Sequence, residues 1–438
     1  MAMIYHVEFL SLKGTLSFDL TSSDPDTFGA IVNDLIACFV PLDVLAKEKR
    51  FEGMRVNTPE HRAAIETFVL KWKHTLPGLQ GLPAFFRTLD EGEHFIALPN
   101  VEVERKGRMG LYMQLQALAE GVPLREIQEP FFALVGDLLN RYKIWSWGDV
   151  RQRIGQPDRT LRRCRFCGRR QPNVTFTQEA HAVSEALGNK TLIVFDECDT
   201  CNAAFASGIE TDVVELFAHY LLFHGVKGKQ GPRAMKGANF EARHSGAGAE
   251  ITLTEGEPHI TETEYVLRLS GGKPFSTLNA YKSLCKYFLS LIPEAELPFF
   301  SQTIDWINGA LTFDDLPPVT RRQNARFSMQ PTLTWYQRLD GDARTPYAVV
   351  EFQLTSLTLV VIVPGCSKDD RTFSSTADFV IFWDAFKHYG NGALWDIGQM
   401  ADPERRRPER IFRFQIPPSS KPPLDRLSTG VISNETAD

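Results

Sequence analysis

Four of the seven cysteines form two C-x-x-C pairs, Cys164/Cys167 and Cys198/Cys201. Each pair can place two thiolates on one tight turn, and roughly thirty residues separate the pairs, as in many zinc sites. Two such pairs brought together supply the four soft ligands that a tetrahedral zinc ion prefers. The alternative is that all four cysteines are free thiols. The doubled spacing favours a structural zinc ion.

The residues between and after these pairs include polar side chains that suit hydrolytic chemistry. His181 lies between the pairs, Asn189 follows Gly188, and Asn202 directly follows Cys201. An imidazole can act as a general base because its pKa lies near neutrality. Each residue also has a plainer interpretation: His181 as an incidental histidine of a zinc ribbon, Asn189 as a turn residue, and Asn202 as a helix cap.

The order and spacing of these residues resemble the HNH family of His-Me finger (ββα-metal) endonucleases, in the subgroup with zinc knuckles. The segments that carry the resemblance are CRFCG, FTQEAHAVSEALGNK and ECDTCNAAF, which together with their spacers cover roughly 50 of the 438 residues. The resemblance implies a ββα module stapled by structural Zn²⁺, and an endonuclease activity that hydrolyses phosphodiester bonds in DNA. It covers one module and not the whole chain.

The resemblance also implies a role for each polar residue. His181 would deprotonate a water molecule in line with the scissile bond, and a loop asparagine, here Asn189, would orient this histidine. Asn202, on the following helix, would bind a catalytic Mg²⁺ or Mn²⁺ ion that stabilises the leaving oxygen. Oxygen ligands would keep this ion distinct from the zinc held by the four cysteines.

One position departs from the commonest pattern of the family. The residue before the catalytic histidine is often acidic or histidine and binds the ion, but here it is Ala180. Glu179 would face the opposite side of a continuing strand, whereas Glu185, Asp196 or Glu197 could supply the missing carboxylate. Ala180 therefore favours an alternative function, a zinc-stabilised nucleic-acid-binding or scaffold protein with an inactive nuclease site.

Basic residues gather beside the first cysteine pair, although the chain has a net charge of −6. That charge argues against a protein that coats nucleic acid over its whole surface. Residues 151–170 hold eight arginines opposed only by Asp158: Arg151, Arg153, Arg159, Arg162, Arg163, Arg165, Arg169 and Arg170. A second basic segment, 225–237, carries Lys227, Lys229, Arg233 and Lys236. Both segments can contact a phosphate backbone, and a solvated linker is the alternative for the first.

The composition and the placement of the single cysteines lead us to expect a cytoplasmic protein. Hydrophobic residues make up 43% of the chain and charged residues 23%, which is ordinary for globular proteins. The start, MAMIYHVEF, lacks the features of a secretory signal, and no apolar run reaches the ~18 residues of a membrane span. Cys38, Cys285 and Cys366 stand singly in apolar segments, as buried thiols do in a reducing compartment.

These observations set expectations for the partners. We expect DNA, with RNA not excluded, and no membrane. A protein partner or a homo-oligomer could form through the flanking regions. A small nuclease module between larger flanks resembles bacterial nucleases used against foreign DNA, and this assignment of a biological role is analogy.

The patterns of apolar residues predict an α+β chain with a central zinc-stapled ββα module, a mainly helical N-terminal region and an α+β C-terminal domain. The expected domains are 1–158, 159–230 for the module, 231–415, and a disordered tail at 416–438. Inside the module we expect strands at 173–177 and 192–196, followed by a helix that starts near Asn202. Outside it we expect a hairpin at 4–20, a loop at 77–83, helices at 59–74, 124–142 and 279–292, and strands at 332–337, 347–354, 357–363 and 379–386.

Overall fold

The computed structural model describes residues 3–40, 53–100, 103, 105–148, 151–227, 231, 233–245, 248–261, 264–339, 343–386 and 395–415. The chain divides into two compact units, Met1–Gly136 and Asp137–Asp438. Both contain helices and sheets, so the predicted α+β class is confirmed. The predicted domain boundaries stay predictions, and the predicted tail lies outside the described residues.

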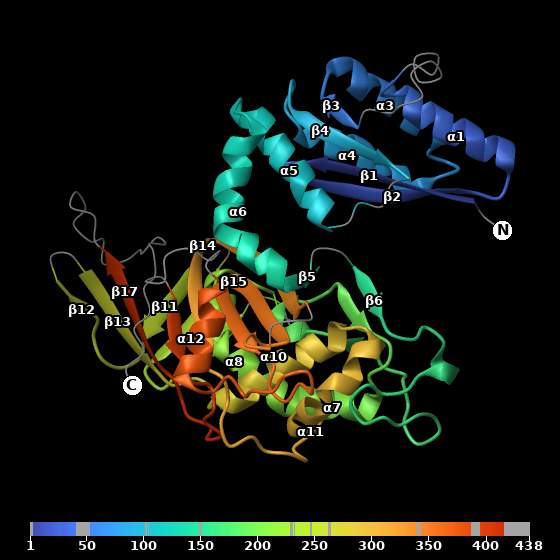
Figure 1. Cartoon of the computed structure of the whole chain (residues 1–438). Helices are drawn as coiled ribbons and strands as arrows, with labels where there is room; N and C mark the ends of the chain where they lie inside the picture. The colour runs from blue at the N-terminus through green and yellow to red at the C-terminus, as the bar shows by residue number, and fades with distance from the viewer. Residues whose placement is uncertain are drawn as a thin grey trace. The chain divides into compact units, whose positions relative to one another are not determined.

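The first unit contains a four-stranded antiparallel sheet with the strand order β2-β1-β4-β3 (Figure 1). Its strands are β1 (Met3–Ser11), β2 (Gly14–Ser22), β3 (Met54–Val56) and β4 (His94–Pro99). Its helices are α1 (Pro25–Ala37), α3 (Pro59–Trp72), η1 (Pro77–Gln80), α4 (Gly81–Thr88), α5 (Arg105–Glu120) and α6 (Leu124–Arg141), which continues into the second unit. The predicted hairpin is confirmed, because the register runs from Met3 opposite Ser22 to Ser11 opposite Gly14.

The predicted loop at 77–83 is wrong, because η1 and α4 occupy this segment. Leu79, Leu82 and Phe86 are buried in the core of this unit, where Phe86 lies edge-on to Phe9. Burial of these side chains outweighs the low helix propensity of the glycines and prolines that suggested a loop.

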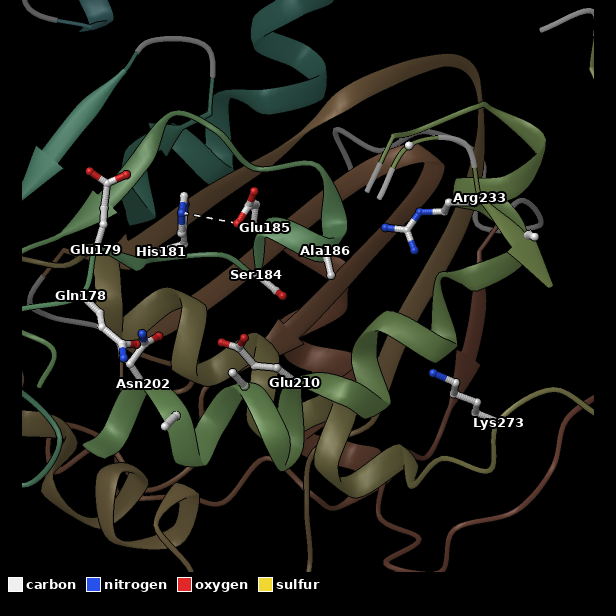
Figure 2. A pocket seen from close by; sticks show the side chains of 14 residues that line it. Gln178, Glu179, His181, Ser184, Glu185, Ala186, Asn202, Glu210, Arg233 and Lys273 are labelled. Atoms are coloured by element: carbon white, nitrogen blue, oxygen red, sulfur yellow. Dashed lines mark ion pairs between the residues drawn. The ribbon is translucent and has the colours of Figure 1, made fainter. Parts of the chain in front are cut away.

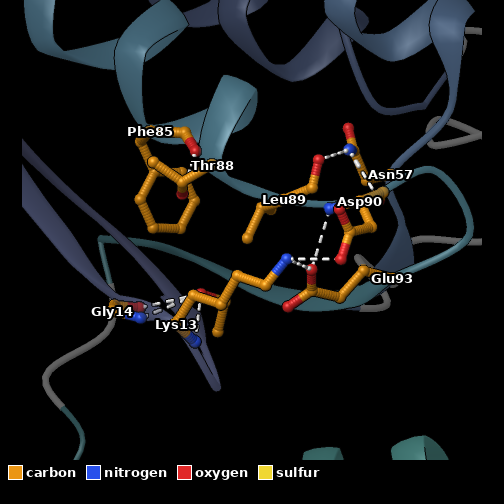
Figure 3. A network of polar contacts seen from close by, with 9 residues as sticks. Lys13, Gly14, Asn57, Phe85, Thr88, Leu89, Asp90 and Glu93 are labelled. Atoms are coloured by element: carbon orange, nitrogen blue, oxygen red, sulfur yellow. Dashed lines mark hydrogen bonds and ion pairs between the residues drawn. The ribbon is translucent and has the colours of Figure 1, made fainter.

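A polar network joins the turn between β1 and β2 to the turn before β4 (Figure 3). The ammonium of Lys13 lies 2.6 Å from an Asp90 carboxylate oxygen and 2.8 Å from a Glu93 carboxylate oxygen. The buried amide of Asn57 donates to the backbone carbonyls of Leu89 and Asp90, each at 3.0 Å. The buried Asn57 bonds stabilise this turn more than the exposed ion pairs do, since water screens the latter.

The second unit contains several small sheets and one long hairpin. The sheet near the cysteines has the order β6-β8-β7, with β6 (Gln152–Ile154) parallel to β8 (Leu192–Val194) and β7 (Ala180–His181) antiparallel to it. The other sheets are formed by β9 (Ala234–Lys236), β10 (Phe240–His244) and β11 (Ala249–Leu253), by β12 (His259–Ile260), β13 (Glu264–Ser270) and β17 (Glu409–Gln415), and by β5 (Tyr142–Trp147), β14 (Val319–Arg338), β15 (Ala348–Ile362) and β16 (Asp396–Gly398). The helices are η2 (Arg159–Leu161), η3 (Glu185–Leu187), α7 (Asp199–Ser207), α8 (Ile209–Leu216), α9 (Ala218–Phe223), α10 (Thr277–Leu291), η4 (Glu294–Phe300), α11 (Ser301–Ile307) and α12 (Thr376–Asp384).

Two predicted strands of this unit are wrong for different reasons. No strand forms at 173–177. At the end of this segment the Asp199 carboxylate accepts hydrogen bonds from the backbone N–H groups of Thr177 (3.0 Å) and of the next residue, Gln178 (2.9 Å). These donors bind a side chain in place of a neighbouring strand. Residues 379–386 lie mostly in α12, where the Ser375 hydroxyl caps the backbone N–H of Asp378.

The helix α10 lies at the centre of the second unit and packs against α8 and β15 (Figure 1). Every residue from Leu284 to Leu291 is buried. One continuous hydrophobic cluster joins residues of the cysteine segment, such as Phe166 and Leu192, to α10, β14 and β15. The cysteine segment therefore shares its core with the chain that follows it.

Candidate functional site

The four paired cysteines come together at one point in the second unit. The sulfur atoms of Cys164, Cys167, Cys198 and Cys201 all lie within 4.8 Å of one another. A hydrogen bond from the Cys201 thiol lowers the pKa of Cys164 to about 5. Four sulfur ligands at this spacing can hold a metal ion such as zinc, because soft thiolates in a tetrahedral set suit that ion.

A buried ion pair fixes the first cysteine turn to the central helix. The guanidinium of Arg165 makes two hydrogen bonds of 2.9 Å to the Asp196 carboxylate and donates to the backbone carbonyl of Leu289 at 2.6 Å. Arg162 is also buried and donates to the carbonyls of Gln156 and Pro157. The interpretation of these two arginines as phosphate contacts is therefore wrong, because their donors are used within the fold.

The other six arginines of this segment differ from Arg162 and Arg165 in exposure. They are Arg151, Arg153, Arg159, Arg163, Arg169 and Arg170, and all are exposed to solvent. The exposed guanidinium of Arg163 donates to the backbone carbonyl of Gly168 at 2.9 Å, which closes the first cysteine turn. The remaining predicted phosphate contacts of this segment stay predictions.

His181 lies on the short strand β7, where it pairs with Ile193 of β8. Its side chain is half-buried, and Nε2 lies 3.9 Å from a carboxylate oxygen of Glu185 (Figure 2). The preceding Ala180 is buried at 1% exposure. The alternation of side chains along a strand thus turns Ala180 into the core and His181 towards solvent.

Asn189 lies in the loop between β7 and β8 and is fully buried. Its amide donates to the carbonyls of Val183 (2.7 Å) and Leu192 (3.1 Å), and its oxygen accepts from the backbone N–H groups of Thr191 and Leu192, both at 3.0 Å. These bonds hold the loop that connects the strand of His181 to its neighbour. The proposed effect of Asn189 on His181 would therefore act through the backbone.

His181 and Asn202 line the same hollow, which encloses about 710 Å³ (Figure 2). Asn202 reaches it from α7, one residue after Cys201. The charged and amide side chains that line the hollow besides these two are Gln178, Glu179, Glu185, Glu210, Arg233 and Lys273. Glu210 and Lys273 are absent from the sequence-based expectations, since neither stands in a recognisable motif.

Several carboxylates could act in place of the acidic ligand that is missing at position 180, and they lie in different parts of the structure. Asp196 is buried and paired with an arginine, and Glu197 is 1% exposed. Glu179 and Glu185 line the hollow, and so does Glu210 from the start of α8. An oxygen ligand for an ion near Asn202 is therefore available from Glu179 and Glu185, whereas Glu210 is buried and lies 3.0 Å from the Lys286 ammonium.

A buried lysine of α10 lies behind the hollow. The ammonium of Lys286, whose side chain is 1% exposed, lies 3.1 Å from a Glu197 oxygen and 3.0 Å from a Glu210 oxygen. It also donates to the backbone carbonyl of His181 at 3.3 Å. Burial acts to lower the pKa of Lys286, but the attraction of the two carboxylates outweighs it and the pKa is raised. Burial raises the pKa of Glu197 to about 7.

In comparisons with known proteins, no protein-family model, curated protein or solved structure matches this chain. None of the helices among the described residues has both the length and the apolar character needed to span a membrane. The cysteine cluster and the hollow beside it are therefore the features of the chain that indicate a function.

Proposed function

We propose that this chain is a metal-dependent HNH endonuclease that hydrolyses phosphodiester bonds in DNA. The observation that supports this most is that His181 and Asn202, brought by β7 and α7, line one hollow beside the four-cysteine cluster. The order of these parts, a strand with histidine, a second strand and a helix with asparagine, is the order expected of a ββα nuclease.

The four cysteines would hold a structural Zn²⁺ ion. Cys164 and Cys198 are buried, and both belong to the hydrophobic cluster that includes α10. A metal ion at this place joins the turn before β7 to the start of α7, and so fixes the two elements that present His181 and Asn202.

His181 would act as the general base that removes a proton from the attacking water. Its half-buried ring on the wall of the hollow is accessible to water and is held by the pairing of β7 with β8. Asn202 would hold a divalent ion, with Glu179 or Glu185 as a source of carboxylate oxygens. Mg²⁺ or Mn²⁺ bound there would neutralise charge on the phosphate and on the leaving oxygen.

The wider biological role remains part of this proposal. A cytoplasmic nuclease that acts on foreign DNA in bacterial defence fits the analogy drawn from the sequence. RNA as a substrate, and a protein partner or homo-oligomer through the flanking regions, are compatible with the same site.

The alternative is a zinc-stabilised nucleic-acid-binding or scaffold protein with an inactive nuclease site. Ala180 favours it, because the position that often supplies an ion ligand carries a buried methyl group. The carboxylates of Glu179 and Glu185 in the hollow favour hydrolysis instead.

A plasmid cleavage assay separates the two functions. The purified chain and a His181→Ala variant are compared in Mg²⁺, in Mn²⁺ and without added divalent ion, with zinc content measured in both. Nicking that needs the ion and is lost in the variant supports the endonuclease. A zinc-loaded chain that binds DNA and leaves it intact under every condition would favour the binding protein.

A further inference from the structure

The hollow that contains His181 and Asn202 has cationic side chains on one side only. Glu179 and His181 lie on one side, and Arg233 and Lys273 lie on the other (Figure 2). We propose that Arg233 and Lys273 form a subsite for a phosphate of the nucleic-acid strand, next to the phosphate that faces His181. This inference rests on the proposed nuclease function. It adds that the nucleic-acid strand runs from His181 towards Arg233 and Lys273.

Arg233 is held in place from two directions. Its backbone carbonyl accepts a hydrogen bond of 3.1 Å from the N–H of His244 in β10, and its Nε donates to the Val226 carbonyl at 3.1 Å. Its Nη2 atom is buried and has no hydrogen-bond partner among the described residues. A buried donor without an acceptor costs free energy, and an anionic oxygen at this place would remove that cost.

Arg233 differs from the cations near it in having no carboxylate partner among the described residues. In the adjoining sheet, Lys236 pairs with Glu241 at 2.6 Å and Arg243 pairs with Glu250 at 2.8 Å. Arg233 forms no ion pair with a carboxylate of the described residues, whereas the charge of Lys273 also acts on the half-buried carboxylate of Glu215. The charge of Arg233 is therefore available to an external anion, and the exposed Lys273 adds positive charge on the same side.

A phosphodiester strand is the anion that fits both sides of the hollow. The guanidinium fork matches two phosphate oxygens, and the exposed Lys273 ammonium adds a point charge at the rim. The side with Glu179 and Glu185 repels an anion unless a divalent ion is bound there, so a single small anion would occupy the cationic side alone. A strand, with phosphates at regular intervals, can place one phosphate at the ion and the next at Arg233.

Direct binding of a short fluorescent DNA duplex tests the subsite without requiring cleavage. Fluorescence anisotropy is measured over a series of salt concentrations in a His181→Ala background, with Arg233→Met, Arg233→Lys and Lys273→Met added singly. We expect Arg233→Met to weaken binding about tenfold and to reduce the salt slope by about one, because one phosphate contact is lost. Arg233→Lys should recover part of the affinity, since it keeps the charge and loses the fork.

The matched controls are Arg243→Met and Lys236→Met, whose native charges are already paired outside the hollow. They should leave the affinity within about twofold of the parent. A folded Arg233→Met variant with unchanged affinity and salt slope would overturn the subsite, even if the wild-type chain cleaves DNA. Weakened binding by Arg233→Met in a chain that never cleaves would support the subsite and count against the nuclease. Inorganic phosphate and unlabelled duplex are also compared as competitors at equal phosphate concentration. If both compete equally, the site binds a free anion and not a strand, and the inference is overturned.

Discussion

The ammonium of Lys286 lies 3.3 Å from the backbone carbonyl oxygen of His181, although 105 residues separate them in the chain. The same ammonium lies within 3.1 Å of Glu197, which precedes the ligand candidate Cys198, and within 3.0 Å of Glu210 at the hollow. One buried cation thus joins the strand of His181, the second cysteine turn and the wall of the hollow. The central helix α10 is therefore part of the support of the site.

Replacing Lys286 by Met should destabilise the chain by about 3–5 kcal/mol, because two buried carboxylates lose their only described cation. Urea denaturation at neutral pH measures this loss. Lys282→Met is the matched control on the same helix, since the half-buried Lys282 lies over the Trp306 ring and pairs with no described carboxylate. It should cost about 1 kcal/mol or less. Equal stabilities of the Lys286→Met variant and the wild type would refute the supporting role.

Replacing Cys198 by Ser should release the bound metal and unfold the segment around the cysteines. A structural ion that binds only the folded segment contributes its binding free energy to folding. Zinc content by mass spectrometry should fall from one ion per chain towards none, together with a loss of circular dichroism. Cys285→Ser, which changes a buried single thiol, should keep the ion. Unchanged zinc content in the Cys198 variant would show that these sulfurs hold no metal.

The two asparagines of the site should respond differently to alanine. Asn189→Ala should lower stability by about 1–3 kcal/mol or more, because it leaves buried backbone donors and acceptors of the β7–β8 loop without partners. Asn202→Ala should leave stability within about 1 kcal/mol, since its half-buried side chain lines the hollow. Its nicking rate should fall at least about tenfold if it holds the ion. The proposed assignment fails if Asn202→Ala cleaves at the wild-type rate.

His219 should make the second unit sensitive to mild acid. Burial, and then the charge of Arg410, hold the pKa of His219 well below its usual value, and both ring nitrogens are buried with no hydrogen-bond partner among the described residues. The unfolded chain binds a proton near pH 6.5 and the folded chain does not, so this contribution to stability is present above about pH 6.5 and is lost as the pH falls. The loss approaches about 1.4 kcal/mol per pH unit below that value.

A His219→Phe variant tests this directly, because the ring packs beside Tyr220, Phe223 and Phe412 and an aromatic replacement keeps much of that packing. The free energy of unfolding is measured by urea denaturation at about pH 5, 6, 7 and 8. The variant should lose less stability than the wild type between about pH 7 and 5. At about pH 8, where the histidine is neutral in both states, the difference between the two unfolding free energies reports packing alone. Parallel curves for the two proteins would contradict the buried neutral histidine.

The sequence by itself determined the parts that depend on local pattern. Each C-x-x-C pair places its two sulfur atoms close together because the spacing confines them to one turn, and the two pairs meet as predicted. The β1–β2 hairpin and α10 follow from alternating and helical apolar patterns, which act over neighbouring residues. The association of His181 with Asn202 was also expected, and both line one hollow.

Only the tertiary structure decided which charged residues are available at the site. Arg165 and the exposed Arg169 look alike in sequence, yet Arg165 is buried and all three of its side-chain nitrogen atoms donate to the Asp196 carboxylate or to the Leu289 carbonyl of α10. Lys286 stands in an apolar helix with no motif, and its role depends on Glu197 and Glu210 folding around it. The strand expected at 173–177 does not form, and the Asp199 carboxylate, 22 residues further along the chain, binds the backbone N–H of Thr177 at its end. Contacts between distant segments, which no local pattern encodes, set these outcomes.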